Sequence, residues 1–334
     1  MKHATHLAVK PQKLATRPFF CVKSTPKMQS TTHHKHLLTG EELKPAQIQA
    51  LINTAIRLKA QRRVHQLRTD LSGQQLALIF DKQSLRTRFS FTIAMRELGG
   101  DVIESIESTR KSETPEDYAN VLSGYCHGIM IRTHADDTLQ QMARVAKVPI
   151  INGLSNLHHP CQVLADLLTL TECWGELSGL TMTYIGDGNN MLHSFLLLAP
   201  QMGINVHYCC PNSRQPDPGI LARALGRLTS NSGNIKAFLT PQAAVKQAQA
   251  IYTDVWTSMG FEAQRADHVF EGFQVNEALM AHADPDAIFM HCLPMERDKE
   301  VSNSLADSAC SVVFQQSENR LHIQKAILLD LLLK

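Results

Sequence analysis

The sequence contains no apolar run that approaches the roughly 18 residues of a membrane-spanning helix. No apolar signal-peptide core follows the N-terminal charges either. The cysteines show no C-x-x-C spacing, and a chain of 334 residues can build its core without disulfides. The eight cysteines are Cys21, Cys126, Cys161, Cys173, Cys209, Cys210, Cys292 and Cys310. We therefore expect a soluble intracellular protein with reduced cysteines and no membrane contact.

Acidic residues are absent from residues 1–40, which hold seven Lys and Arg. The rest of the chain carries 26 of the 33 basic residues and all 31 acidic ones, so nucleic acid is not an expected partner. Residues 1–35 contain three prolines and no apolar periodicity, which predicts a disordered basic tail. An acid-free N-terminus is also typical of organellar transit peptides. The expected location is the cytoplasm, with an organelle as the alternative.

The chain has the length of about two domains, and short apolar runs alternate with helical patterns along it. Strands are expected at residues 76–80, 102–106, 128–131, 148–151, 180–185, 204–208, 250–253 and 287–290. A break at residues 175–179 separates the first four strands from the others. Strands that alternate with helices are typical of parallel sheets. We predict an α/β fold with two doubly wound parallel-sheet domains joined by interdomain helices, the last at about residues 317–333.

A loop rich in cations and hydroxyls joins the first expected strand to a helix. It reads Ser84-Leu85-Arg86-Thr87-Arg88, and Phe91, Met95 and Leu98 follow it at helical spacing. Free N–H groups and the positive dipole end of a helix favour an anion, and Arg86 adds donors that match phosphate oxygens. The loop lacks the Gly-x4-Gly-Lys frame of a nucleotide P-loop, which favours a phosphate compound smaller than ATP. The alternative is an ordinary capped helix with a basic first turn.

Polar segments also follow other expected strands, at the edge where open parallel sheets bind ligands. They are Arg132, the tetrad at 159–162, the turn at 186–190, and the segments 254–260 and 291–294. The turn does not read G-x-G-x-x-G, and no acidic residue ends the strand that follows it. A bound dinucleotide is therefore not expected.

Seven motifs, in this order, resemble those of the ornithine carbamoyltransferases of the aspartate/ornithine carbamoyltransferase superfamily. They are Ser84-Leu85-Arg86-Thr87-Arg88, Arg132-Thr133, His159-Pro160-Cys161-Gln162, Gly186-Asp187-Gly188-Asn189-Asn190, Asp254-Val255-Trp256-Thr257-Ser258-Met259-Gly260, His291-Cys292-Leu293-Pro294 and Glu318-Asn319-Arg320. The resemblance covers residues 36–334. It implies a carbamoyl-phosphate-binding domain over residues 36–175, an ornithine-binding domain over residues 176–316, and a C-terminal helix over residues 317–334 that packs back on the first domain.

The implied reaction transfers the carbamoyl group of carbamoyl phosphate to the side-chain amine of L-ornithine and yields L-citrulline and phosphate. It is a step of arginine biosynthesis or of urea-cycle type. The resemblance implies neither a metal nor another cofactor.

The resemblance also implies roles for single residues. The phosphate would contact Ser84, Arg86, Thr87 and the Leu85 backbone. The carbamoyl end would contact Arg132, His159, Gln162, Cys292, Arg320 and the Leu293 backbone. Ornithine would contact Asn190, Asp254, Ser258 and Met259. The catalytic residues would be Arg132, His159, Asp254 and Cys292.

These residue types suit the chemistry. An amine with a lysine-like pKa must lose a proton before it attacks a carbonyl carbon, and Asp254 and Cys292 are the candidates that manage this proton. The intermediate carries negative charge on its carbonyl oxygen, which Arg132, His159 and the Thr87 hydroxyl can stabilise as fixed donors. Taken singly, His159 and Asp254 are also typical of caps, and Cys292 of a small buried hydrophobe.

The chain departs from the family pattern in two places that bear on the phosphate site. Leu85 replaces a threonine that contributes chiefly its backbone, so binding should survive. Residues 107–113 lack the glutamine or histidine that relatives extend into a neighbouring subunit's phosphate site. The family implies a homo-oligomer, a trimer, in which this segment completes the adjacent site.

Two alternatives remain open at this stage. One is a carbamoyltransferase for another amine, such as putrescine or aspartate. Ser258-Met259-Gly260 favours ornithine over aspartate, because an aspartate site needs cations for a second carboxylate. The other is a non-catalytic homologue that only binds these ligands.

Overall fold

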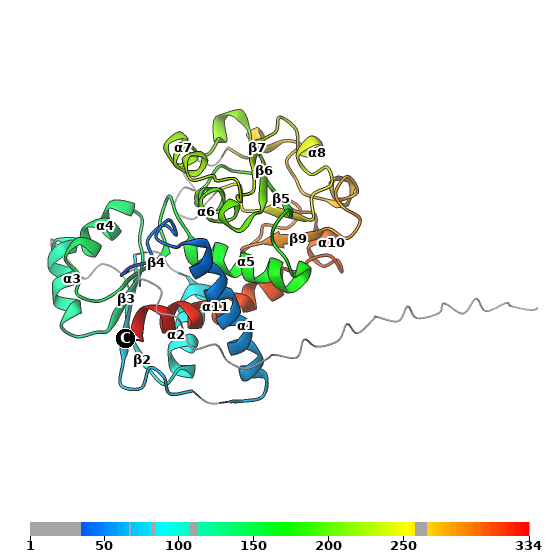
Figure 1. The fold of residues 1–334 in the computed structure, drawn as a ribbon. Coiled ribbons are helices and arrows are strands. Elements are labelled where there is room, and N and C mark those ends of the chain that lie inside the picture. Colours follow the sequence, from blue (N-terminus) through cyan, green and yellow to red (C-terminus); the bar gives the residue numbers. More distant parts are fainter. Residues whose placement is uncertain (1–34, 67, 82–83, 107–112, 258–265, 334) are drawn as a thin grey trace, which may run out of the picture. The chain divides into compact units, whose positions relative to one another are not determined.

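The structure is a computed structural model that describes residues 35–66, 68–81, 84–106, 113–257 and 266–333. Two parallel sheets flanked by helices form the described part of the chain (Figure 1). None of the described helices is long and apolar enough to cross a bilayer. Three predictions fall outside the described residues: the basic tail up to residue 34, most of the segment 107–113, and the ornithine ligands Ser258 and Met259.

The first half of the chain forms a four-stranded parallel sheet with the order β2-β1-β3-β4. Its strands are β1 (Gln75–Phe80), β2 (Asp101–Ile106), β3 (Gly128–Arg132) and β4 (Ile150–Leu154). Its helices are α1 (Pro45–Arg63), α2 (Leu85–Glu97), α3 (Pro115–Ser123), α4 (Asp136–Val145) and α5 (Pro160–Trp174).

Alternate residues of the first sheet face opposite layers of helices. Leu76 and Leu78 of β1 pack into the core that holds α1, α2 and α5. Ala77 and Ile79 of the same strand pack with α3 and α4 on the other face. Both faces are therefore apolar, which explains why these strands appear in the sequence as continuous apolar runs. Helices on both faces make the sheet doubly wound, as predicted.

The second half forms a five-stranded parallel sheet with the order β7-β6-β5-β8-β9. Its strands are β5 (Thr181–Ile185), β6 (Asn205–Cys209), β7 (Ile235–Ala237), β8 (Ala250–Thr253) and β9 (Ile288–His291). Its helices are α6 (Asn190–Leu198), α7 (Pro218–Gly226), α8 (Pro241–Ala244), α9 (Glu277–Met280) and α10 (Asn303–Ala306). Short 3-10 turns lie at Pro200–Met202, Asn212–Arg214 and Asp267–Phe270.

The second sheet is also covered on both faces. Tyr184 and Tyr252 belong to the core that contains α6, and Phe195 of α6 packs edge-on against Tyr252. Ile185 and Ile251, which alternate with them, pack with α8, α9 and α10.

The last helix, α11 (Val313–Leu332), contacts α1, α2 and α5 (Figure 1). Ion pairs add to this packing, because Lys59 of α1 pairs with Glu172 of α5 at 2.9 Å and Lys325 of α11 pairs with Glu97 of α2. Residues of α5 and α11 lie in one core with residues of both sheets. These two helices therefore join the two sheets. Their packing brings the loop that begins at Ser84 next to the motif that contains Arg320.

All eight expected strands are present, with ends shifted by up to three residues. The strand expected at residues 148–151 is corrected to β4, which begins after Pro149 because proline has no N–H for the ladder. The last helix begins at Val313, not near Ser317, because Val313 is already buried in the second sheet's core. The strand β7 was not expected, since it is a short, largely exposed edge strand without an apolar run.

Candidate active site

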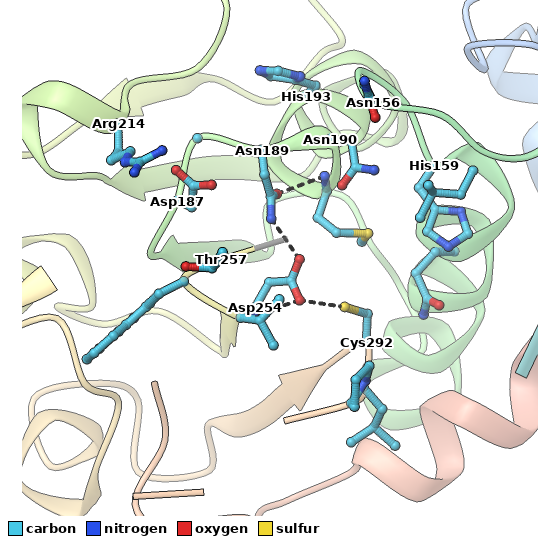
Figure 2. A pocket seen from close by; sticks show the side chains of 18 of the residues that line it. Asn156, His159, Asp187, Asn189, Asn190, His193, Arg214, Asp254, Thr257 and Cys292 are labelled. Atoms are coloured by element: carbon cyan, nitrogen blue, oxygen red, sulfur yellow. Dashed lines mark hydrogen bonds between the residues drawn. The ribbon is translucent and has the colours of Figure 1, made fainter. Parts of the chain in front are cut away.

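Strand ends of both sheets and the helix α11 surround a cavity of about 450 Å³ (Figure 2), a size typical of small-molecule sites. The predicted site residues that line it are Ser84, Arg86, Arg132, His159, Gln162, Asn190, Asp254, Cys292, Leu293 and Arg320. Thr87 is fully buried next to them. The Leu85 side chain is 66% exposed, which leaves its backbone as the part that can serve a ligand.

The first turn of α2 forms one end of the cavity. Ser84 is the N-cap residue, and its Oγ accepts hydrogen bonds from the Thr87 backbone N–H at 3.3 Å and from Arg132 Nη1 at 3.2 Å. Thr87 Oγ1 accepts from Arg320 Nη2 at 2.7 Å and from Arg132 Nη1 at 3.4 Å. Each hydroxyl thus already accepts two hydrogen bonds. Its own hydrogen is left to donate to an oxygen of a ligand.

Three guanidinium groups converge on this turn. Burial and the neighbouring cations lower the pKa of Arg132 to about 9 and the pKa of Arg320 to about 10. Burial also lowers the pKa of Arg86. All three groups remain cationic at neutral pH, so their mutual repulsion in a partly dehydrated site favours an anionic ligand.

His159 stands at the N-terminus of α5, and its imidazole is neutral. Burial and the three guanidinium groups hold the pKa of His159 well below its usual range. The His159 backbone N–H donates to Ser194 Oγ of α6 at 2.7 Å, which fixes the residue between the two sheets. A neutral imidazole offers one N–H donor, which suits a carbonyl oxygen.

Several buried polar atoms around the cavity have no hydrogen-bond partner within the described part of the chain. Four of them belong to predicted site residues, namely Arg132 Nε, His159 Nδ1, Gln162 Oε1 and Arg320 Nε. Leaving such an atom unpaired costs about 1–3 kcal/mol, and native proteins contain few of them. These four atoms, three nitrogens and one oxygen, fit a polar ligand that both donates and accepts hydrogen bonds.

Cys292 and Asp254 face each other on the side of the cavity formed by the second sheet (Figure 2). Cys292 Sγ donates to Asp254 Oδ1 at 3.0 Å. Asn189 Nδ2 donates to Asp254 Oδ2 at 2.7 Å, and the Val255 backbone N–H donates to Oδ1 at 2.8 Å. Burial and the Asp254 carboxylate raise the pKa of the Cys292 thiol well above its usual range. Cys292 is therefore a neutral thiol at physiological pH rather than a thiolate nucleophile.

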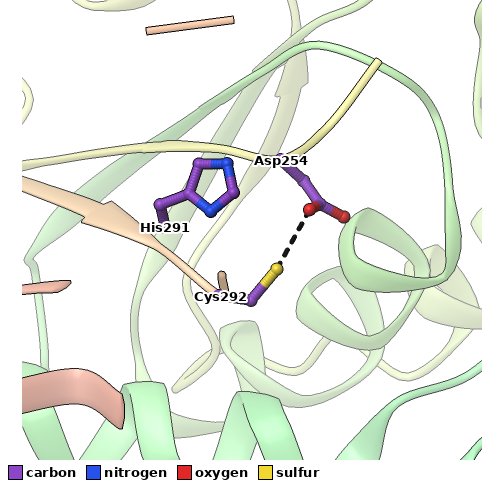
Figure 3. Close-up of side chains that lie close together, drawn as sticks. All are labelled: Asp254, His291 and Cys292. Atoms are coloured by element: carbon purple, nitrogen blue, oxygen red, sulfur yellow. Dashed lines mark hydrogen bonds between the residues drawn. The ribbon is translucent and has the colours of Figure 1, made fainter. Parts of the chain in front are cut away.

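His291 lies beside this pair, so that one atom each of Asp254, His291 and Cys292 fall within 4.8 Å of one another (Figure 3). Such a trio can hold a metal ion only through a free ring nitrogen. His291 Nδ1 accepts the Leu293 backbone N–H at 2.9 Å, and Nε2 lies 3.2 Å from Glu300 Oε1. Both ring nitrogens are engaged, so the donor set does not favour a metal. The histidine instead fixes the Leu293 backbone, which has a φ of 58°.

Four residues of the turn after β5 line the cavity, Asp187 to Asn190; of these, Asn190 was a predicted ornithine ligand and Asn189 was not assigned a role. Asn190 lines the cavity, and its Nδ2 donates to the Ser155 carbonyl at 2.7 Å. Asn189 caps α6 through Oδ1 and holds Asp254 through Nδ2. An asparagine before a helix is a recognisable capping signal. Its second contact depends on a residue 65 positions away, which the sequence does not reveal.

Comparison with known proteins identifies the family. The carbamoyl-P binding domain of aspartate/ornithine carbamoyltransferases matches residues 35–172, and their Asp/Orn binding domain matches residues 178–331. The ornithine carbamoyltransferase of Parasynechococcus marenigrum (strain WH8102) is 43% identical over 300 residues, which cover 88% of this chain and 93% of the relative. The chain belongs to the ornithine carbamoyltransferase family.

Solved structures of the family have the same fold. The ornithine carbamoyltransferase from Pyrococcus furiosus matches with a TM-score of 0.87 at 39% identity, over 91% of this chain and 99% of that chain. A mitochondrial ornithine carbamoyltransferase from Coccidioides immitis matches with a TM-score of 0.84 at 30% identity, over 90% and 98% of the two chains. The family and the two-sheet α/β fold predicted from the motifs are confirmed.

Proposed function

We propose that this chain transfers the carbamoyl group of carbamoyl phosphate to the side-chain amine of L-ornithine and releases L-citrulline and phosphate. One observation carries the proposal. Three guanidinium groups and the Ser84 hydroxyl line the same cavity as the Cys292 and Asp254 pair, and the Thr87 hydroxyl is buried next to them. The first group suits a phosphate and the second suits a cationic amine, so the cavity fits both reactants of this transfer.

Carbamoyl phosphate would bind with its phosphate at the first turn of α2. Ser84, Arg86 and Thr87 then meet the phosphate oxygens, as charge-assisted donors. Arg132 and the neutral His159 meet the carbonyl oxygen, where negative charge develops during attack. Because these donors are already held by Ser84, Thr87 and Ser194, they need little reorganisation in the transition state.

The amine would approach from the side of the second sheet. Asp254 attracts the ammonium form of ornithine, and the neutral thiol of Cys292 lies beside the reacting nitrogen. The ammonium nitrogen loses one proton before it attacks the carbonyl carbon, and Asp254 and Cys292 are the candidates that pass this proton to solvent. A second proton leaves the nitrogen as the C–N bond forms, and the departing phosphate takes it up. The C–O bond to phosphate then breaks, and the departing phosphate is anionic in a cationic site.

A carbamoyl-transfer assay with three acceptors tests the proposal. Carbamoyl phosphate is supplied with ornithine, putrescine or aspartate, and the product is measured for each. We expect a kcat/KM for ornithine that exceeds the other two by at least about 100-fold. Putrescine lacks the α-amino-acid end and aspartate lacks the side-chain amine, so each leaves polar groups of an ornithine pocket unpaired. If the protein prefers putrescine, then putrescine and not ornithine is its substrate. No transfer to any amine would indicate a ligand-binding homologue.

We further propose that the chain acts as a homotrimer. Leu85 and Phe89 of α2 and Ile103 of β2 are large apolar side chains with exposures of 57–66%, at the edge of the first sheet. Exposed apolar side chains gathered in one region favour burial against another subunit. The adjacent segment 107–112, which lies outside the described residues, is the candidate for completing a neighbouring phosphate site.

We also assign the reaction to arginine biosynthesis in the cytoplasm. The described cysteines, Cys126, Cys161, Cys173, Cys209, Cys210, Cys292 and Cys310, are all free thiols, which fits a reducing compartment. An organellar location remains the alternative if residues 1–35 act as a transit peptide.

A further inference from the structure

A fully buried carboxylate lies one helical turn beyond Gln162, outside the lining of the cavity. Asp166 Oδ1 accepts hydrogen bonds from Gln162 Nε2 at 2.9 Å and from Gln316 Nε2 of α11 at 2.8 Å. Its Oδ2 accepts from the Tyr252 hydroxyl of β8 at 3.2 Å. Gln316 Nε2 also donates to the Tyr252 oxygen at 3.1 Å. One carboxylate therefore receives three donors, from its own helix, the last helix and the second sheet.

An ionised carboxylate can only accept hydrogen bonds, and this property determines how the two glutamine amides turn. The NH2 group of Gln162 must face Asp166, so its Oε1 faces away from Asp166. This oxygen is buried without a partner in the described part of the chain, and Gln162 lines the cavity. It is an acceptor ready for an N–H group of a ligand. In carbamoyl phosphate, the carbamoyl NH2 is the only nitrogen donor.

The second amide is fixed in the same way. The NH2 group of Gln316 faces Asp166, so its Oε1 can accept the His291 backbone N–H at 3.0 Å. His291 directly precedes Cys292, whose thiol faces Asp254. Asp166 thereby sets the carbamoyl side of the cavity through Gln162 and the amine side through Gln316.

The ionised form of Asp166 is the one that the geometry requires. Burial raises the pKa of Asp166 to about 7, against the opposing effects of its three hydrogen-bond donors and the positive charge of Arg320. The titratable groups that face it are Arg320 of α11, Tyr252 of β8 and Cys292 after β9. Protonation of Oδ2 would change the Tyr252 hydroxyl from a donor to an acceptor and would leave the two amides with a neutral, weaker acceptor at Oδ1.

We propose that Asp166 is a positioning residue for the reaction: its carboxylate orients Gln162 toward the carbamoyl NH2 and, through Gln316, holds the backbone that carries Cys292. The inference rests on the proposed function for the identity of the first ligand, carbamoyl phosphate. It does not depend on which amine is the acceptor.

The experiment compares Asp166→Asn with Thr169→Val. Thr169 lies one turn further along α5, is also fully buried, and accepts from Asn319 Nδ2 of α11 at 2.9 Å. Both variants lose polar contacts between α5 and α11, but Thr169 makes no hydrogen bond to Gln162 or Gln316 in the described residues. Dissociation constants for carbamoyl phosphate and for inorganic phosphate are measured by calorimetry, and the constant for carbamoyl phosphate is measured as a function of pH without ornithine, whose own deprotonation would add an acid limb to kcat/KM.

We expect Asp166→Asn to weaken carbamoyl phosphate about tenfold while inorganic phosphate binds as in the wild type, because phosphate does not use Gln162. Thr169→Val should lower the unfolding temperature without changing the ratio of the two constants. In the wild type, the affinity for carbamoyl phosphate should fall as the pH decreases through about 7, since protonation weakens the acceptor that orients both amides. This acid limb of the affinity should be absent from Asp166→Asn.

Equal affinity ratios in wild type and Asp166→Asn, or an unchanged acid limb, would overturn the inference. If Asp166→Asn does not fold, Tyr252→Phe decides the question. Removing one donor to the charged form raises the pKa of Asp166, so the acid limb should move to higher pH, and an unmoved limb would overturn the inference. Carbamoyl phosphate that fails to bind the wild type would instead contradict the proposed function itself.

Discussion

The Thr87 hydroxyl connects two of the arginines at the first turn of α2. Its oxygen accepts hydrogen bonds from two buried guanidinium groups, those of Arg132 and Arg320, and its hydrogen remains for the ligand. Thr87 itself is completely buried. A single side chain therefore holds two cations apart at fixed positions and adds a donor of its own. Its removal should affect binding and stability together.

Thr87→Val keeps the shape of the side chain and removes the oxygen. We expect kcat/KM for carbamoyl phosphate to fall about 10- to 100-fold, and the unfolding temperature to fall as well, because two buried guanidinium groups lose an acceptor. Steady-state kinetics and calorimetry measure the two effects. Ser90→Ala is the control, since within the described residues Ser90 Oγ donates to carbonyls of α2 alone, at 2.6 Å to that of Arg86. Similar losses in both variants would show that any change in α2 lowers activity and stability, and that the Thr87 hydroxyl has no specific role in them.

The Cys292 thiol gives a second prediction at this scale. The Asp254 carboxylate helps to raise the pKa of Cys292, so at pH 8 a smaller fraction of this residue is ionised to the thiolate than of an ordinary cysteine. Asp254→Asn removes the negative charge, lowers the pKa of Cys292 and should speed its alkylation by iodoacetamide several-fold. Mass spectrometry of the labelled peptides measures the rate, with Cys310 as the internal control. An unchanged rate at Cys292 would show that the carboxylate does not act on this thiol.

Most site residues were predictable because each follows a strand in a parallel sheet. Arg132, Asp254 and Cys292 stand within one residue of a strand end, where side chains of distant strands meet. Asp166 was not predictable in this way. It lies inside an apolar helix, and its partners Tyr252 and Gln316 are 86 and 150 residues away in the sequence. Its importance arises only from the packing of α5 against α11 and β8.

At the scale of elements, the turn before α6 and the loop after β6 form one wall of the cavity. The Gly188 backbone N–H donates to the Arg214 carbonyl at 2.8 Å. A Cβ at Gly188 would lie 2.4 Å from backbone atoms of Gln215 and Pro216, closer than any real contact. Only glycine allows the two segments to approach this closely. The position of Asn189 and Asn190, which follow in the same turn, depends on this approach.

Gly188→Ala should therefore displace the turn. We expect a loss of about 1–3 kcal/mol in the free energy of unfolding, together with a raised KM for ornithine and a nearly unchanged KM for carbamoyl phosphate. Gly226→Ala is the matched control, because a Cβ there meets no atom within 4 Å at the end of α7. The control should be neutral or stabilising by up to about 1 kcal/mol. A normal KM for ornithine in Gly188→Ala would show that this wall of the cavity does not bind ornithine.

The elements that the sequence predicted well are those buried on both faces, since their apolar runs are unmistakable. The ends were less predictable because tertiary packing sets them. The helix α11 begins at Val313, which is buried in the core of the second sheet. The strand β7 forms by pairing with the edge of β6. Neither reason can be read from the local sequence.

At the scale of the whole molecule, the exposed apolar side chains bear on subunit assembly. Phe89 of α2 is 57% exposed, and it directly follows the first turn of this helix. A trimer that buries this region would couple assembly to activity. Leu239 offers a comparison, since it is 92% exposed in the loop after β7, in the second half of the chain.

Phe89→Glu should dissociate the oligomer, because a buried interface does not tolerate an unpaired charge. Sedimentation velocity should show a monomer, and the specific activity should fall by at least about tenfold. Leu239→Glu introduces the same charge and should leave both the sedimentation coefficient and the activity unchanged. A wild type that sediments as a monomer with full activity would contradict the proposed trimer.

The most direct test of the account is a crystal structure with a phosphonate analogue that joins the skeletons of carbamoyl phosphate and ornithine. The account predicts that the phosphonate contacts Ser84, Arg86 and Thr87, and that the carbonyl oxygen contacts Arg132 and His159. The amino-acid end should lie beside Asp254. A phosphonate bound away from the first turn of α2, or an amino-acid end that does not reach the Asp254 side of the cavity, would contradict it.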